Sequence, residues 1–62
     1  MRGNINMKNY GVYIREVGAQ AWQLEEITNK EKAHVAEEAN VNFGVQTLIV
    51  GPLSTFPKWL ET

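Results

Sequence analysis

His34 is the single histidine of the chain, and it lies among glutamates at helical spacing. Glu31 precedes it by three residues, and Glu37 and Glu38 follow within one turn, so on a helix these groups would share one surface. Such a group could hold a metal ion. Protein metal sites usually combine several histidine or cysteine ligands, and this chain has no cysteine. We therefore interpret the group as a solvated helix face and expect no metal and no other cofactor.

The hydroxyl and carboxyl groups show no catalytic arrangement. The serine and the threonines have no base or nucleophile turn beside them, and one histidine does not complete a triad. Glu25 and Glu26 are neighbours, and neighbouring residues of a strand point to opposite faces, so they would not converge on one substrate. Gly51-Pro52 lacks the lysine and hydroxyl residue of a phosphate-binding loop. We predict that the chain is not an enzyme.

Aromatic side chains on a strand can stack nucleic-acid bases, and Tyr10, Tyr13 and Arg15 are grouped in this way. A small nucleic-acid-binding or transcription-regulatory module is therefore one alternative function. The formal net charge of -1, however, gives no general attraction to phosphate. Tyrosine at a sheet surface or interface is the simpler interpretation, and nucleic acid is not an expected partner.

The 62 residues are enough for one domain, which we expect over residues 8–62 after a flexible tail over residues 1–7. Without cysteine there is no disulfide to reinforce so small a core. No charged residue lies between Ala39 and Pro57, but asparagine, glycine, glutamine and proline interrupt this stretch too often for a membrane span. The first residues include no apolar run of signal-peptide length. We expect a cytoplasmic protein with no membrane partner.

Three strands are predicted from aromatic and β-branched residues. Tyr10–Val17 and Ala21–Glu25, separated by a short turn with Gly18, indicate a hairpin. Phe43–Pro52 is the densest apolar stretch, and its residues Leu48, Ile49 and Val50 are apolar in succession. Such a run is typical of a strand covered on both faces, so we place it in the centre of the sheet.

One helix and a shorter helical turn complete the predicted architecture. Thr28 and Glu31 match a capping box, so a helix is expected from there to about Asn40, with alanines as a thin inward stripe. Phe56, Trp59 and Leu60 have the spacing of one helical face, which predicts a short C-terminal helical turn. The fold class is therefore α+β, with a three-stranded sheet in the order β-β-α-β along the chain.

A three-stranded sheet with a single helix has one face left to cover. A homodimer, formed face to face or through an edge strand, is the simplest cover; the alternative is that Phe56 and Trp59 fold back over that face. Tryptophan and tyrosine are frequent interface anchors. The candidate contact residues for a partner are therefore Tyr13, Trp22, Phe56 and Trp59, each of which has a place in the core as its other interpretation.

Two resemblances bear on function. The expected helix from Lys30 to Asn40 and the strand that leads into Val50-Gly51-Pro52-Leu53-Ser54 resemble the sporulation-related repeat, whose last strand runs into a similar turn. This resemblance covers about half of the chain, and the chain lacks the second full helix of that family. The resemblance implies peptidoglycan binding. In size and lack of cysteine the chain is also similar to the small proteins that bacteriophages encode to block a host enzyme or defence complex.

These observations lead to three hypotheses. The first is a non-enzymatic homodimer that binds another protein, as a phage-type inhibitor of host defence or of another host enzyme complex. The second is the nucleic-acid-binding module, and the third is a cell-wall-binding module.

Overall fold

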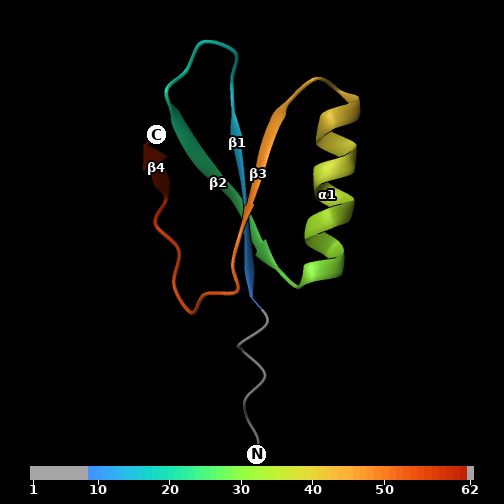
Figure 1. The fold of residues 1–62 in the computed structure, drawn as a ribbon, viewed down its shortest axis with the longest axis vertical. Helices are drawn as coiled ribbons and strands as arrows, with labels where there is room; N and C mark the ends of the chain where they lie inside the picture. The colour runs from blue at the N-terminus through green and yellow to red at the C-terminus, as the bar shows by residue number, and fades with distance from the viewer. Residues whose placement is uncertain (1–8, 62) are drawn as a thin grey trace, which may run out of the picture.

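The computed structural model describes residues 9–61. The elements follow one another as β1 (Tyr10–Arg15), β2 (Ala21–Thr28), α1 (Lys30–Asn42), β3 (Gln46–Val50) and β4 (Trp59–Glu61). The strands form one antiparallel sheet in the order β3-β1-β2-β4. α1 lies on one side of this sheet and the segment 51–58 passes on the other (Figure 1). The tail expected over residues 1–7 lies outside the described residues.

The expectation of a three-stranded sheet with a C-terminal helical turn is wrong. Residues 59–61 form the fourth strand, in which Leu60 lies opposite Trp22, and residues 51–58 contain no helix. The backbone N–H of Leu24 donates to the Lys58 carbonyl at 2.9 Å, which extends the pairing by one residue. A single helical turn leaves most of its own backbone groups unpaired, whereas pairing with β2 satisfies them.

The placement of Phe43–Pro52 in the centre of the sheet is also wrong. The strand within this stretch, β3, lies at one border, and β1 occupies the middle between β2 and β3. The apolar residues of β3 are explained by its pairing with β1. Ile49 pairs with Val12 on one face while Leu48 pairs with Tyr13 on the other, so a border strand can be apolar on both faces.

α1 begins and ends at local signals of its own. The Asn29 side chain accepts a hydrogen bond from the Lys32 backbone N–H at 2.8 Å, so Asn29 is the N-cap, not the expected Thr28. At the other end Gly44 has a φ of 79°, in the left-handed region, and its N–H donates to the Val41 carbonyl at 2.9 Å. Ala33 is the one fully buried residue among the described residues of the helix, which allows a close approach to the sheet.

The core is centred on β1. Val12 and Tyr13 are both fully buried, and because neighbouring strand residues point to opposite faces, they fill the two sides of the sheet. The Tyr13 hydroxyl donates to the Pro57 carbonyl at 2.6 Å, and the Phe56 ring lies against Gly11, which places both on the face away from α1. The chain therefore covers part of its second face with its own C-terminal segment. No helix in the described part of the chain is both long and apolar enough to cross a membrane.

A side chain at Gly11 is expected to lower the stability of the fold while Phe56 is present. A Cβ at this position would lie 2.7 Å from Cδ1 of the Phe56 ring, too close for ordinary contact. Gly11→Ala should therefore lower the free energy of unfolding by about 1–2 kcal/mol, as overpacking commonly does. In a Phe56→Leu background the same change should cost clearly less. Urea denaturation of the four proteins measures this coupling, and an equal cost in both backgrounds would contradict the packing.

Burial raises the pKa of the Tyr13 hydroxyl above its ordinary value of 10.0. Because the pKa of Tyr13 is higher in the folded than in the unfolded state, the protonated hydroxyl favours the folded state. This contribution is complete below pH 10 and is lost as the pH rises through the folded-state pKa. We expect the free energy of unfolding to fall above about pH 10, and to fall less steeply in Tyr13→Phe. Urea titrations between pH 8 and 11 measure both slopes, and identical slopes would show that Tyr13 ionises equally in both states.

Candidate partner-binding groove

The four predicted contact residues lie in very different surroundings. Tyr13 is fully buried, Trp22 is 9% exposed, and Phe56 is half-buried against Gly11. Trp59 alone among these four is largely exposed, at 59% of its surface. The structure therefore brings Tyr13 and Phe56 together in the core region under the C-terminal segment and leaves Trp59 on the outside. A partner can reach Trp59 without any rearrangement of the chain.

A groove of about 350 Å³ lies beside Trp59. It is lined by five consecutive residues of β2, Gln23 to Ile27, together with Lys58 and Trp59. The groove exists because β4 is short and pairs only with residues 21–23 of β2. After the hydrogen bond from the Leu24 N–H to the Lys58 carbonyl, the two segments diverge. Beyond that point, among residues 9–61, the outer side of β2 has no strand partner.

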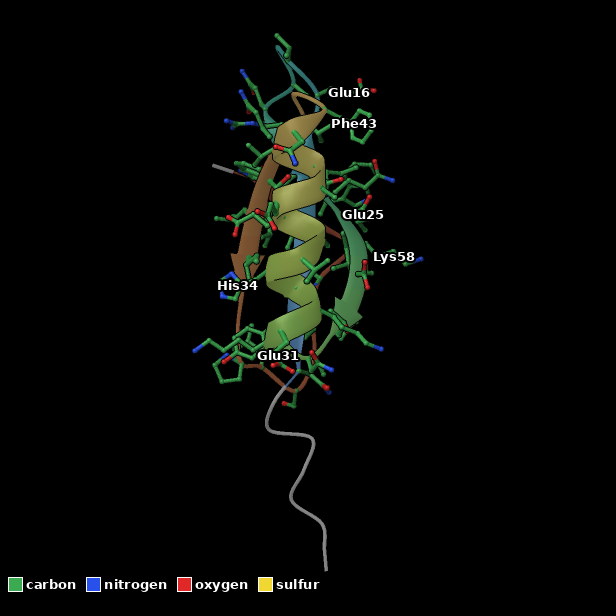
Figure 2. All side chains as sticks on the ribbon, turned by 90° about the vertical axis from the view of Figure 1, so that its right-hand side faces the viewer. Glu16, Glu25, Glu31, His34, Phe43 and Lys58 are labelled. Carbon is green, nitrogen blue, oxygen red and sulfur yellow. The ribbon has the colours of Figure 1, made fainter. Side chains whose placement is uncertain are left out.

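A bulge in β2 shapes the same place. Val12 of β1 lies opposite Glu26, but the next residue, Tyr13, lies opposite Leu24, so Glu25 is the extra residue. The Glu25 carboxylate accepts a hydrogen bond from the Asn40 side chain of α1 at 3.0 Å. Bulges bend a strand, raise its twist and re-aim side chains. Here the bulge ties one wall of the groove to the helix. Figure 2 shows Glu25 and Lys58 at the same border of the sheet.

A second hollow lies on the other side of Trp59. It measures about 260 Å³ and is lined by residues of β1, the β1–β2 turn and β2, namely Ile14, Arg15, Glu16, Ala19, Ala21 and Gln23, together with Trp59. Trp59 and Gln23 lie opposite each other in the sheet and line both hollows. The indole is thus a ridge between two depressions, held by a paired backbone. The rim of the first groove carries charges of both signs, from Lys58 and from the glutamates of β2.

The groove combines apolar and charged surface. Ile27 is 50% exposed and adds to the apolar area of Trp59, while Glu26 and Lys58 are exposed charges. An aromatic anchor surrounded by polar groups is the usual composition of a protein-binding surface. The arrangement can desolvate an apolar group of a partner against the indole and pair charges around it.

His34 and the neighbouring glutamates lie on an exposed part of α1. The imidazole Nδ1 lies 3.4 Å from Glu37 Oε1, with the two side chains 60% and 40% exposed. Nowhere in residues 9–61 do three His, Cys, Asp or Glu side chains gather closely enough to hold a metal ion. Figure 2 shows His34 and Glu31 on α1, away from the Lys58 border. This face of the helix is solvated.

The residues suggested for base stacking are engaged within the chain. Arg15 places its guanidinium 4.2 Å from the centroid of the Trp22 ring and donates from Nε to Gln46 Oε1 at 2.8 Å. Tyr13 bonds to Pro57, as described above. The Trp22 indole N–H is buried and has no hydrogen-bond partner among the described residues. Tyr10, the third residue of this group, is half-buried.

Sequence reasoning missed the lining residues Gln23, Ile27 and Lys58. One signal was available: β2 continues through Glu26 and Ile27 to Thr28, and Glu25-Glu26 breaks the alternation that Trp22 and Leu24 establish. A broken alternation within a strand indicates a bulge, and bulges are frequent beside binding sites. No comparable signal marks Lys58, whose place depends on the pairing of β4 with β2.

No protein-family model, no curated protein and no solved structure matches this chain.

Proposed function

We propose that this chain is a non-enzymatic protein that acts by binding another protein, with Trp59 and its flanking hollows as the contact surface. The observation that carries the proposal is the 59% exposure of Trp59 on a paired strand between two depressions. Tryptophan is rarely left on a surface, because its burial is worth several times that of a small side chain. When it is exposed beside a groove, it commonly anchors an interface.

The size of the chain agrees with binding as its role. Its described surface is 4509 Å². A standard protein interface covers about 800 Å² on each partner, so one partner would cover about a fifth of this surface. A protein this small can therefore use a large part of its surface to cover a site on its partner. This supports an inhibitor that covers a site on its target, rather than a scaffold for chemistry.

We further propose that the protein works in the cytoplasm as a homodimer and that its target is a host enzyme or defence complex, in the manner of phage-encoded inhibitors. The lack of cysteine in the sequence suits a reducing compartment. The small core, with Val12, Tyr13, Trp22 and Ala33 as its buried apolar residues among those described, suits a chain that gains stability by association.

Affinity purification from a bacterial extract tests the proposal with three baits. They are the unaltered chain, Trp59→Ala, and the matched control Phe43→Ala, which removes an aromatic ring that is 86% exposed but lies outside both hollows. We expect one specific protein to be retained by the unaltered chain and by Phe43→Ala, and to be lost with Trp59→Ala. Recovery of no protein that depends on Trp59 would contradict the proposal. Circular dichroism confirms that each bait is folded.

A further inference from the structure

The two borders of the sheet are protected very differently. β4 has three residues, including Glu61, and follows Lys58, while the open part of β2 carries Glu25 and Glu26. Short length and charge are the usual means by which a border strand avoids pairing with another chain. β3, at the other border, has five residues, Gln46-Thr47-Leu48-Ile49-Val50, with no charge and no proline.

The outer side of β3 is available for pairing. All five residues pair with β1 on the inner side, from Gln46 opposite Arg15 to Val50 opposite Gly11. On the outer side no strand of residues 9–61 pairs with β3. Figure 2 shows β3 at the border of the sheet, beside α1 rather than beneath it. Its unpaired backbone groups are therefore a template for one more strand.

We propose that β3 pairs antiparallel with β3 of a second copy of this chain, about a two-fold axis at Leu48. Such an axis stands perpendicular to the sheet, so one residue must face its own copy, and paired side chains point to the same face. With Leu48 on the axis, all five residues pair: Leu48 with Leu48, Thr47 with Ile49, and Gln46 with Val50. Any other centre within the strand leaves some of these residues unpaired.

A second copy suits this border because the strand is self-complementary. An isologous seam brings each charge near its own like, and directly opposed like charges destabilise a strand pair. No residue between Ala39 and Pro57 is charged, so the seam strand and its flanking segments contribute no such repulsion. Leu48 is 37% exposed in the single chain, and its contact with its own copy would remove this apolar surface from water.

The seam would leave both Trp59 grooves open. β3 and β4 occupy opposite borders of the sheet, so joining two copies at β3 places the two copies of β4 at the outer ends of one continuous sheet. The dimer would then carry two binding grooves facing away from its centre. A target with two equivalent sites would be held more tightly than by one groove alone. This inference rests on the proposed homodimer and is independent of what the groove binds.

Cross-linking of single-cysteine variants locates the seam, since the natural chain has no cysteine. Leu48→Cys should be joined into a covalent dimer by a short bis-maleimide, because opposed residues in an antiparallel pair lie about 5 Å apart at Cβ. Val17→Cys, in the exposed β1–β2 turn, is the matched control and should stay monomeric on denaturing gels. Equal cross-linking of the two variants would overturn the seam.

Analytical ultracentrifugation separates the seam from the dimer itself. The unaltered chain should sediment as a dimer at micromolar concentration, and Leu48→Lys should raise the dimer dissociation constant at least tenfold by opposing two ammonium groups. Leu53→Lys, 44% exposed and outside β3, should stay dimeric. A monomeric unaltered chain would overturn both the homodimer and the seam. A dimer that Leu48→Lys leaves unaffected would overturn the seam alone. The seam would also be overturned if Leu48→Lys abolished binding of a captured target and left the dimer intact.

Discussion

Val12→Asp is expected to unfold the chain. Val12 is fully buried in the middle strand, and alternation along β1 directs its side chain to the side of α1. An aspartate there would lie beside Glu26, its partner on β2, so two carboxylates would oppose each other across the strand pair. A buried, unpaired carboxylate costs several kcal/mol, which is most or all of the stability of a domain of this size. Circular dichroism and thermal melting should show no cooperative transition.

Two comparisons make the Val12 prediction specific. Val17→Asp introduces the same charge at a residue that is 86% exposed, and its stability should stay within about 0.5 kcal/mol of the unaltered chain. Ile49→Asp, on the half-buried border strand, should fall between the two, because the new carboxylate can turn towards solvent. A Val12→Asp variant that melts like Val17→Asp would contradict the placement of β1 at the centre of the core.

Tyr13→Ala carries the second largest expected effect. Removing a fully buried aromatic ring costs about 3–5 kcal/mol through lost burial and the cavity left behind. The change would also remove one of the contacts that hold the C-terminal segment, the 2.6 Å hydrogen bond from Tyr13 to the Pro57 carbonyl. We therefore expect a largely unfolded protein, measured as a loss of the urea transition.

Tyr13→Phe separates the ring from its hydroxyl. It keeps the packing and removes one part-buried hydrogen bond to the Pro57 carbonyl, so it should cost only about 0.5–1.5 kcal/mol. If the phenylalanine variant were as unstable as the alanine variant, the hydrogen bond and not the ring would be the main contribution of this residue. That outcome would contradict the account of the core.

Local sequence signals predicted the elements better than their arrangement. The strands beginning at Tyr10 and Ala21, the helix beginning at Lys30 and the strand within Phe43–Pro52 are present, since each depends on residues close in sequence. The order of the strands depends on pairing between distant segments. An apolar run such as Leu48-Ile49-Val50 indicates that both faces of the strand are apolar, and it carries no information about which edge is paired.

The C-terminal segment was misread for a related reason. Phe56, Trp59 and Leu60 have helical spacing, but each is placed by a different contact: Phe56 by Gly11, Trp59 by Gln23 and Leu60 by Trp22. In a segment of a few residues, such spacing cannot distinguish a helical turn from a short strand.

The candidate site was predictable only in part. Trp59 was among the expected contact residues and lies exposed beside the groove, whereas the groove itself arises where β4 ends against β2. That end depends on the pairing of β4 with β2, which joins segments distant in sequence, whereas the bulge at Glu25 has a local signal in the broken alternation at Glu25-Glu26. Tyr13 and Trp22 have the residue types of interface anchors, but their burial shows that the same types serve the core here.

The most direct test of the central claim is the affinity of the captured target for Trp59 variants. Once that protein is purified, calorimetric titration gives its dissociation constant for the unaltered chain, Trp59→Ala and Phe43→Ala. An interface anchor contributes about 2 kcal/mol or more, so Trp59→Ala should weaken binding about thirtyfold, while Phe43→Ala should change it less than twofold. Equal dissociation constants for the unaltered chain and Trp59→Ala would contradict the claim that the Trp59 groove is the binding surface.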